Sequence, residues 1–323
     1  MSRPTLYISR LLPDPVMATA HERFQLINEP RDLSPSWETV RAGLREADAA
    51  ICTLTDRVDA AMLADLARLK VLANYAVGYN NIDLAAATRH GIVVTNTPDV
   101  LTESTADLTW ALILAVARRV AEGDAYVRSG TWPGWAPTQM LGADVSGKML
   151  GIVGMGRIGQ AVARRAAGFN MRICYSSRTA HSSDWLSAQW ERRELPDVLR
   201  DSDFVSLHVP LIRETRHLVG ARQLALMKPT AFLLNTSRGP VVDEAALVSA
   251  LLQRRLAGAG LDVFEQEPAF HSRLRELRQV VLLPHLGSAT LATRVRMGMI
   301  CLENIAAVLA GVPAPNQVKP EQE

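Results

Sequence analysis

Short apolar runs alternate with amphipathic stretches along most of the chain. In the first third, the apolar runs that predict strands cover residues 6–9, 49–53, 71–73 and 93–94. Stretches with helical spacing, such as residues 57–68 and 83–89, lie between them. Strand–helix alternation with short connections predicts a parallel sheet with helices on both faces. We therefore expect residues 1 to about 98 to form one α/β unit.

The rest of the chain predicts a helix, an irregular arm and a second α/β unit. The helix is expected over residues 101–123, with Thr102 as its cap. The arm, residues 129–147, is rich in tryptophan, proline and glycine, and a last helix is expected over residues 291–311. The apolar runs that predict six strands of a second parallel sheet cover residues 149–153, 171–175, 204–209, 231–235, 258–263 and 280–283.

Length and composition are those of an ordinary globular protein. The chain has 323 residues, which favours two domains, and 48% of them are hydrophobic. The 35 Lys and Arg against 33 Asp and Glu leave a net charge of +2, so we expect no nucleic-acid partner. The N-terminus lacks an apolar signal region, and residues 108–116 are too few to span a bilayer, so we expect no membrane association.

The cysteines indicate a reducing compartment. Cys52, Cys174 and Cys301 are few, odd in number and far apart in the sequence. This pattern predicts neither a disulfide framework nor a zinc site. We expect a cytoplasmic protein without a structural or catalytic metal.

A glycine motif follows the first apolar run of the second unit. Its cofactor-binding residues are expected to be Gly154, Gly156, Arg157, Ile158 and Gly159, in the order G-x-G-x-x-G. The first glycine allows a tight turn, the second lets the backbone approach a pyrophosphate, and the third lets the helix pack closely on the strand. Because a strand precedes this motif and a helix follows it, the sequence predicts a dinucleotide site at the start of that helix.

The end of the next predicted strand indicates which dinucleotide is bound. An NAD-binding unit usually carries Asp or Glu there, about 20 residues after the motif, to hold the ribose 2′-hydroxyl. Here the sequence is Tyr175, Ser176, Ser177, Arg178 and Thr179, with no acid. Hydroxyls donate to a 2′-phosphate, and Arg178 pairs with it as a charged fork. We therefore predict NADP(H) in preference to NAD(H).

Three later segments carry side chains suited to the chemistry of 2-oxo acids. Residues 235–240, 260–268 and 283–288 each follow an apolar run, so they are expected at the carboxyl ends of strands, where open α/β sheets bind ligands. Arg238 suits a substrate carboxylate, because its planar fork matches two oxygens. His285 suits proton delivery near neutral pH, and a carboxylate such as Glu267 beside it favours the charged imidazole.

At these motifs the sequence resembles the D-isomer-specific 2-hydroxyacid dehydrogenase family, over nearly the whole chain. The resemblance rests on the glycine motif and on residues 203–210, 235–242, 258–268 and 284–289. Within the family, residues 77–83, 101–107 and 175–179 are most similar to the NADPH-dependent glyoxylate/hydroxypyruvate reductases. The resemblance implies reduction of glyoxylate or hydroxypyruvate to the D-2-hydroxy acid, with NADPH as hydride donor and His285 as proton donor.

The resemblance also implies a fold and further site residues. The fold would be two doubly wound parallel-sheet domains with a cleft between them: a flavodoxin-like substrate domain, 1–98 plus 288–323, and a Rossmann coenzyme domain, 99–287. Asp262 would bind the nicotinamide amide. The other implied cofactor residues are Thr105, His208, Pro210, Thr215, Thr236 and Gly287. Backbone at Val77 and Gly78 would hold the substrate carboxylate, with Leu54 and Tyr75 as candidates for the pocket wall.

Such enzymes are usually homodimers through the coenzyme domain. The arm at 129–147 is similar to the part that reaches the partner subunit. Trp135 in this arm would either pack in the dimer interface or enter the partner's substrate pocket, and the sequence leaves both alternatives open.

Other functions on the same scaffold remain open from the sequence. They are a 2-ketogluconate-type reductase, a 3-phosphoglycerate dehydrogenase and an oxidiser of formate or phosphite. The phosphite-oxidising relatives resemble a version of this loop that has a lysine before Gly78. No such lysine is present here. A different class is a corepressor-like protein that senses NADP(H) and binds protein partners. The complete set of Arg238, Glu267 and His285 favours turnover over this class.

Overall fold

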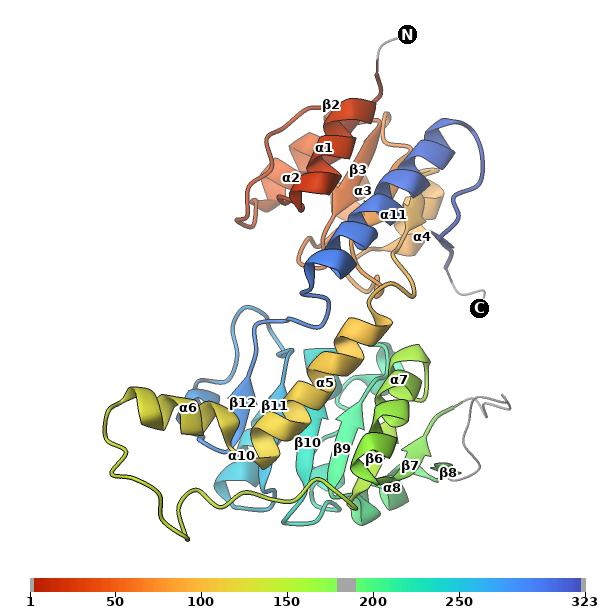
Figure 1. The fold of residues 1–323 in the computed structure, drawn as a ribbon. Helices are drawn as coiled ribbons and strands as arrows, with labels where there is room; N and C mark the ends of the chain where they lie inside the picture. The colour runs from red at the N-terminus through yellow and green to blue at the C-terminus, as the bar shows by residue number, and fades with distance from the viewer. Residues whose placement is uncertain (1–2, 179–189, 321–323) are drawn as a thin grey trace. The chain divides into compact units, whose positions relative to one another are not determined.

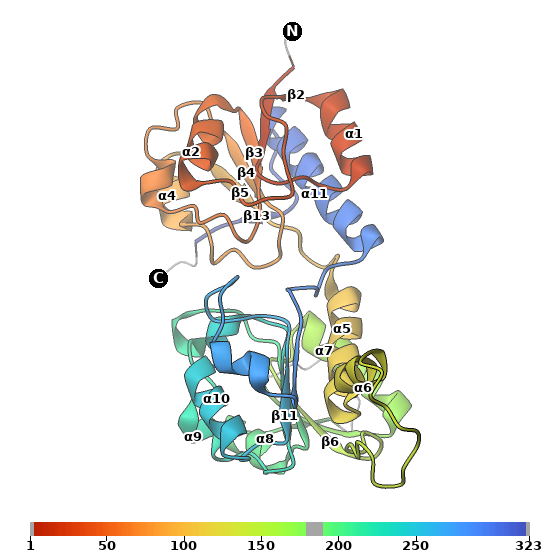
Figure 2. The same cartoon turned by 90° about the vertical axis from the view of Figure 1, so that its left-hand side faces the viewer.

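The computed structural model describes residues 3–178 and 190–320 (Figures 1 and 2). Within them, the chain forms two compact α/β units. The first contains Met1–Leu101 together with Ser288–Glu323, and the second contains Thr102–Gly287. Both are built on parallel sheets, which confirms the predicted fold class.

The sheet of the first unit has the order β13-β5-β4-β3-β1-β2. All of its pairings are parallel except that of β13 with β5. Its parallel part therefore has the flavodoxin-like strand order. The strands are β1 (Thr5–Ile8), β2 (Gln25–Leu26), β3 (Ala49–Cys52), β4 (Val71–Asn74), β5 (Val93–Thr95) and β13 (Gln317–Val318), and the helices are α1 (Asp14–Arg23), α2 (Trp37–Glu46), α3 (Ala60–Leu63), α4 (Leu84–Arg89) and α11 (Leu291–Leu309).

Two apolar clusters cover the faces of this sheet. Leu44 of α2 and Met62 of α3 are buried with Leu72 on one face. Helices α1 and α11 cover the other face, where Val16 and Leu302 are buried (Figure 2). Because both faces are covered, the strands are apolar at nearly every position rather than at alternate ones.

The sheet of the second unit is parallel throughout, with the order β12-β11-β10-β9-β6-β7-β8. The order changes direction at β6, which lies between β7 and β9, so the dinucleotide site of such folds is expected there. The strands are β6 (Met149–Val153), β7 (Arg172–Ser176), β8 (Trp190–Arg192), β9 (Phe204–Leu207), β10 (Phe232–Asn235), β11 (Gly258–Leu261) and β12 (Val280–Leu282), and the helices are α5 (Thr102–Ala117), α6 (Val120–Arg128), α7 (Arg157–Ala166), α8 (Leu195–Asp201), α9 (Ala221–Leu224) and α10 (Glu244–Leu252).

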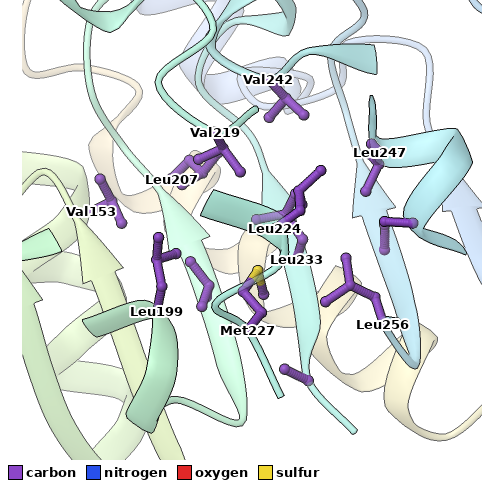
Figure 3. Packing of buried hydrophobic residues seen from close by; sticks show 14 of the residues in the cluster. Val153, Leu199, Leu207, Val219, Leu224, Met227, Leu233, Val242, Leu247 and Leu256 are labelled. Atoms are coloured by element: carbon purple, nitrogen blue, oxygen red, sulfur yellow. The ribbon is translucent and has the colours of Figure 1, made fainter. Parts of the chain in front are cut away.

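This sheet also separates two apolar clusters. On one face, Leu207 and Leu233 pack with Leu199 of α8, Leu224 of α9 and Leu247 of α10 (Figure 3). The other face packs against α5 and α7 (Figure 1). The parallel pairing of the strands fixes their register, which positions the loops that follow them.

The predicted helix over residues 101–123 is wrong as a single element. It is two helices, α5 and α6, separated at Arg119, whose φ is +55°. The carbonyl of Ala117 accepts the N–H of Ala143 at 2.8 Å, so the returning arm ends α5. Gly142 permits this approach, because a Cβ there would lie 2.4 Å from the same carbonyl oxygen.

Several short elements were not predicted from the sequence. The second sheet has β8 in addition to the six predicted strands, and the first has the two-residue strands β2 and β13. Residues 57–68 form only the short helix α3. These elements lie at sheet edges or are too short to leave a clear apolar pattern in the sequence.

Candidate active site

The glycine motif forms the turn between β6 and α7. Gly154 has a φ of +98°, and a Cβ there would lie 2.7 Å from the backbone of His208. Gly159 packs on this turn so closely that a Cβ would lie 2.2 Å from the carbonyl oxygen of Gly154. Around Gly156 a Cβ would meet no heavy atom of the described residues within 4 Å. Arg157 and Ile158 form the first turn of α7. A helix start of this kind suits a pyrophosphate, because its first N–H groups have no carbonyl partner within the helix.

The expected 2′-phosphate residues lie at the end of β7. Ser176 is the last residue of this strand, and its carbonyl accepts the N–H of Gly154 at 2.8 Å, so the segment adjoins the glycine turn. Ser177 and Arg178 follow, and Thr179 lies outside the described residues. The guanidinium of Arg192 in β8 donates to the carbonyls of Ser177 (2.9 Å) and Arg178 (3.3 Å). Sequence reasoning missed this support, because β8 itself was not predicted.

His208 follows β9 beside the glycine turn. Its N–H donates to the carbonyl of Val153 at 2.7 Å, and its Nε2 lies 2.8 Å from the Ser206 hydroxyl. Burial lowers the pKa of His208 to about 3, so the imidazole is neutral at ordinary pH. A neutral ring beside the glycine turn acts through hydrogen bonds and contact rather than through charge.

The remaining expected cofactor residues lie near the carboxyl ends of the strands of the second unit. The hydroxyl of Thr215 donates to the carbonyl of Pro210 at 2.6 Å in the segment after β9. Thr236 follows β10 and lies 2.9 Å, hydroxyl to hydroxyl, from Thr109 of α5. The hydroxyl of Thr105 donates to the carbonyl of Gly287 at 3.1 Å, which ties α5 to the segment after β12.

Arg238 and Glu267 are brought together by a close backbone approach. Arg238 follows β10, and Glu267 lies in the loop after β11. Between these loops, Gly239 contacts the backbone of Phe264 so closely that a Cβ would lie 1.8 Å from the Phe264 carbonyl oxygen. The N–H of Phe264 in turn donates to Glu267 Oε1 at 3.0 Å. Only glycine therefore fits next to Arg238.

Glu267 also contacts His285. Its Oε2 lies 2.9 Å from His285 Nδ1, and the two side chains are 25% and 26% exposed. Burial raises the pKa of Glu267, but hydrogen bonds from His285 and Phe264 and the charges of His285 and Arg238 outweigh it, so the pKa lies below its usual value. An ionised carboxylate only accepts hydrogen bonds, so the His285 nitrogen that contacts it, Nδ1, carries a hydrogen. The other ring nitrogen, Nε2, is then the atom able to exchange a proton with a bound molecule.

Arg238 is the cation of the group. Burial lowers its pKa, while the negative charge of Glu267 acts in the opposite direction. Arginine remains charged in proteins at all ordinary pH values, so a cation, an anion and an imidazole lie at the ends of neighbouring strands. This set is able to bind a carboxylate and to give a proton to a carbonyl oxygen beside it.

Asp262 supports the segment that carries His285. His285 has a φ of +56°, in the left-handed region that few residues other than glycine adopt. The carboxylate of Asp262 accepts the next two N–H groups, those of Leu286 (2.6 Å) and Gly287 (2.9 Å). Asp262 is 1% exposed, and burial raises its pKa. Sequence reasoning assigned Asp262 to the nicotinamide amide and missed this contact with the segment that carries His285.

The expected substrate residues of the first unit lie in the loops after β3 and β4. The carbonyls of Val77 and Gly78 accept the side-chain amides of Asn96 and Asn74, each at 2.8 Å. The Tyr75 hydroxyl donates to the carbonyl of Arg294 in α11 at 2.5 Å, and burial raises the pKa of this hydroxyl. Leu54 is 36% exposed.

The arm after α6 exposes apolar side chains. Trp135 is 82% exposed and Trp132 is 48% exposed. The indole N–H of Trp132 donates to the side chain of Gln139 within the arm. The exposed apolar side chains of α6 and the arm are Val120, Val127, Trp132, Trp135 and Leu141.

The described residues form neither a metal-binding cluster nor a helix that could cross a membrane. Among residues 3–178 and 190–320, no group of three or more His, Cys, Asp or Glu side chains is placed to hold a metal ion. In the same part of the chain, no helix combines the length and apolarity needed to cross a bilayer.

The chain is similar to known proteins over most of its length. Residues 110–287 match the family model described as D-isomer specific 2-hydroxyacid dehydrogenase, NAD binding domain. A glyoxylate reductase of Thermococcus litoralis is 48% identical over 98% of this chain and 97% of its own. The crystal structure of the TT0316 protein of Thermus thermophilus is 45% identical, with a TM-score of 0.91 over 97% of this chain and 99% of that one.

A third relative was solved with a cofactor. An NADPH-dependent glyoxylate/hydroxypyruvate reductase of Sinorhizobium meliloti, in complex with NADP and malonate, is 33% identical. It superposes with a TM-score of 0.87 over 98% of this chain and 97% of that one. The chain belongs to the D-isomer specific 2-hydroxyacid dehydrogenases. It is an oxidoreductase of this class, which confirms the family and the enzyme class predicted from the motifs.

Proposed function

We propose that this enzyme reduces glyoxylate or hydroxypyruvate to the D-2-hydroxy acid with NADPH. The observation that carries the proposal is the contact of Glu267 with His285 at 2.9 Å, with Arg238 in the loop after the neighbouring strand β10. Similarity to glyoxylate reductases over 98% of the chain supports the choice of substrate. A small 2-oxo acid offers a carboxylate for Arg238 and a carbonyl oxygen for His285.

The mechanism follows from the arrangement of these side chains. Bound NADPH would supply a hydride to the carbonyl carbon. Arg238 holds the carboxylate in two-point geometry and fixes which face of the carbon is presented. Protonated His285 gives its Nε2 proton to the carbonyl oxygen, so the C=O bond becomes H–C–O–H. Glu267 holds the ring by Nδ1 and stabilises its positive charge, and Asp262 holds the backbone that carries it.

The preference for NADPH rests on the segment after β7. Within residues 175–178 no carboxylate is present to repel a 2′-phosphate, and Arg178 supplies positive charge. Arg192 binds the carbonyls of Ser177 and Arg178 and so limits the conformations of this segment. We assign the unit Thr102–Gly287 to the dinucleotide, with Thr105, His208, Pro210, Thr215, Thr236, Asp262 and Gly287 as contributing residues.

We assign the other unit to substrate binding, through the backbone of Val77 and Gly78. We also propose a homodimer in which the exposed apolar side chains of α6 and the arm are covered by a second copy. A Trp135→Ala variant separates the two roles of Trp135. A loss of dimer in light scattering indicates packing, whereas an intact dimer with a raised KM for the acid indicates a contribution to the partner's pocket.

The test of the function is a substrate panel. Loss of absorbance of the reduced nicotinamide is followed with glyoxylate, hydroxypyruvate and 2-ketogluconate, and the configuration of the product from hydroxypyruvate is determined. Rapid NADPH oxidation with the two smaller acids and a D-glycerate product are expected. Turnover of 2-ketogluconate alone, or an L product, would contradict the proposal.

A further inference from the structure

In the loop after β4, three successive peptide groups are held by hydrogen bonds to their carbonyls. The carbonyls of three consecutive residues all accept hydrogen bonds from the body of the unit. Ala76 accepts the N–H of Thr97 at 3.0 Å, while Val77 and Gly78 accept the side chains of Asn96 and Asn74. Across residues 3–178 and 190–320, the N–H groups of Val77, Gly78 and Tyr79 donate no hydrogen bond.

The hydrogen bonds to these carbonyls explain the direction in which the N–H groups point. A trans peptide group holds its C=O and the following N–H in one plane and in opposite directions. A bond that draws the carbonyl of Val77 toward Asn96 therefore turns the N–H of Gly78 the other way. The same holds for the carbonyl of Gly78 and the N–H of Tyr79. Three successive N–H groups turned away from the donors that hold the carbonyls are suited to binding an anion.

The two asparagines are held firmly in the unit. Asn74 is the last residue of β4 and is fully buried, with its side-chain oxygen 3.3 Å from the side-chain nitrogen of Asn81. Asn96 follows β5, and its own N–H donates to the carbonyl of Asn316. A backbone carbonyl only accepts hydrogen bonds. The side-chain atom of each asparagine that contacts the carbonyl must therefore be the amide nitrogen and not the amide oxygen.

We propose that Asn74 and Asn96 are positioning residues for the substrate carboxylate. They set the direction of the peptide groups at residues 77–79, and the N–H of Tyr79 is a donor in addition to those of Val77 and Gly78. The inference rests on the proposed function, because it concerns the acid that the enzyme reduces. Neither asparagine touches the acid. Their loss lets the peptide groups rotate, which weakens binding without removing a group that takes part in the chemistry.

The central experiment compares Asn96→Ala with Asn28→Ala. Asn28 is a matched control in the same unit, because its side-chain nitrogen also donates to a backbone carbonyl, that of Ile8, at 2.8 Å. In Asn96→Ala, the KM for glyoxylate should rise about tenfold, as expected for loss of one part-buried hydrogen bond. The kcat at saturation and the Kd for NADPH should change little. Asn28→Ala should lower the Tm without raising the KM.

An equal rise of KM in both variants, or an unchanged KM in Asn96→Ala, overturns the inference. If the unmutated enzyme reduces none of the acids, the proposed function fails instead, and the two failures are thereby distinguished.

A second measurement uses the unmutated chain and a non-reacting pair of ligands. Glycolate with NADPH gives no turnover, since both are already reduced. In protein labelled with [15N]glycine, the amide resonance of Gly78, identified by its loss in Gly78→Ala, should shift on addition of glycolate. The shift should be much smaller in Asn96→Ala at the same concentration. A Gly78 resonance that stays in place while glycolate competes with glyoxylate in the assay overturns the inference.

Discussion

Two loop regions of the molecule carry the proposed chemistry, and they are built differently. In the unit Thr102–Gly287, the loops after β10, β11 and β12 present the side chains of Arg238, Glu267 and His285. In the other unit, the loop after β4 presents backbone N–H groups and uses its side chains only as supports. Both regions lie at the carboxyl ends of parallel strands, where open α/β sheets bind ligands.

The difference shows where the information for each site lies. The side-chain region needs particular residue types, so its members are recognisable in the sequence. The backbone region needs a conformation, and the residues that fix it are 4 and 19 positions from the carbonyls they hold. Substitutions should therefore affect the first region through chemistry and the second through binding.

The largest effect is expected when the side-chain region loses its proton donor. His285→Asn keeps a polar side chain but cannot carry a proton to the substrate. We expect kcat/KM for reduction to fall by about 10²–10⁴-fold, the usual contribution of a general acid. The Kd for NADPH, measured by nucleotide fluorescence, should be unchanged. His21→Asn at the exposed end of α1 is the control and should keep full activity. A fall of less than threefold in His285→Asn contradicts the assignment.

The second-largest effect is expected when a backbone contact beside Arg238 is disturbed. Gly239→Ala places a Cβ 1.8 Å from the Phe264 carbonyl oxygen, so the loop that carries Arg238 must move. A displacement of about 1 Å is able to cost about 10²-fold in rate. We expect kcat/KM to fall by that order and the Tm to drop. In Gly168→Ala the new Cβ meets nothing within 4 Å among the described residues, so both quantities should stay at the parent values. Equal behaviour of the two variants would argue against a fitted contact.

A smaller effect is expected for the cofactor side of the same unit. Arg178→Ala should raise the KM for NADPH by about 10- to 100-fold, because a hydrogen bond to a charged group contributes about 1.5–3 kcal/mol. The KM for NADH should not change, since NADH lacks the 2′-phosphate. Arg172→Ala, at the opposite end of β7, is the matched control. If both nucleotides are affected equally, Arg178 serves the structure of the loop and not the phosphate.

The smallest effect at neutral pH is expected for Glu267→Gln. The pKa of Glu267 is lowered, so its negative charge is present throughout the working range and favours protonated His285. In the parent, kcat/KM should fall as pH drops through the lowered pKa of Glu267, because protonation of the carboxylate ends its ionic contact with His285. Glu267→Gln carries no such charge, so this acid limb should be absent from its pH profile. The variant also loses a stabilising contact that, in the parent, is present above the usual carboxyl pKa and is lost as pH falls through the lowered one. An acid limb that stays at the same pH in Glu267→Gln contradicts the role of Glu267.

Much of the side-chain region could be predicted from the sequence. The glycine motif and the placement of Arg238, Glu267 and His285 followed from apolar runs with suitable residues after them. The backbone region was only partly accessible. The resemblance pointed to Val77 and Gly78, but the hydrogen bonds from Asn74 and Asn96 require the sheet to bring distant residues together.

The predictions that failed or were missing share a physical cause. The break between α5 and α6 depends on the return of residues 142–143 to the carbonyl of Ala117, a long-range contact that helix periodicity does not contain. Arg192 reaches the loop after β7 only because β8 pairs with that strand. The contacts of Asp262 with Leu286 and Gly287 were missing from the sequence prediction, because they depend on the pairing of β11 with β12.

The most direct test of the account is the steady-state rate of glyoxylate reduction with NADPH and with NADH, measured side by side on the unmutated enzyme. The account predicts rapid oxidation of NADPH and a kcat/KM for NADH that is lower by at least the factor that Arg178→Ala removes. Rapid oxidation of NADH with little or no oxidation of NADPH would contradict the interpretation of residues 176–178. Absence of turnover with both nucleotides, despite NADPH binding, would contradict the proposed reaction.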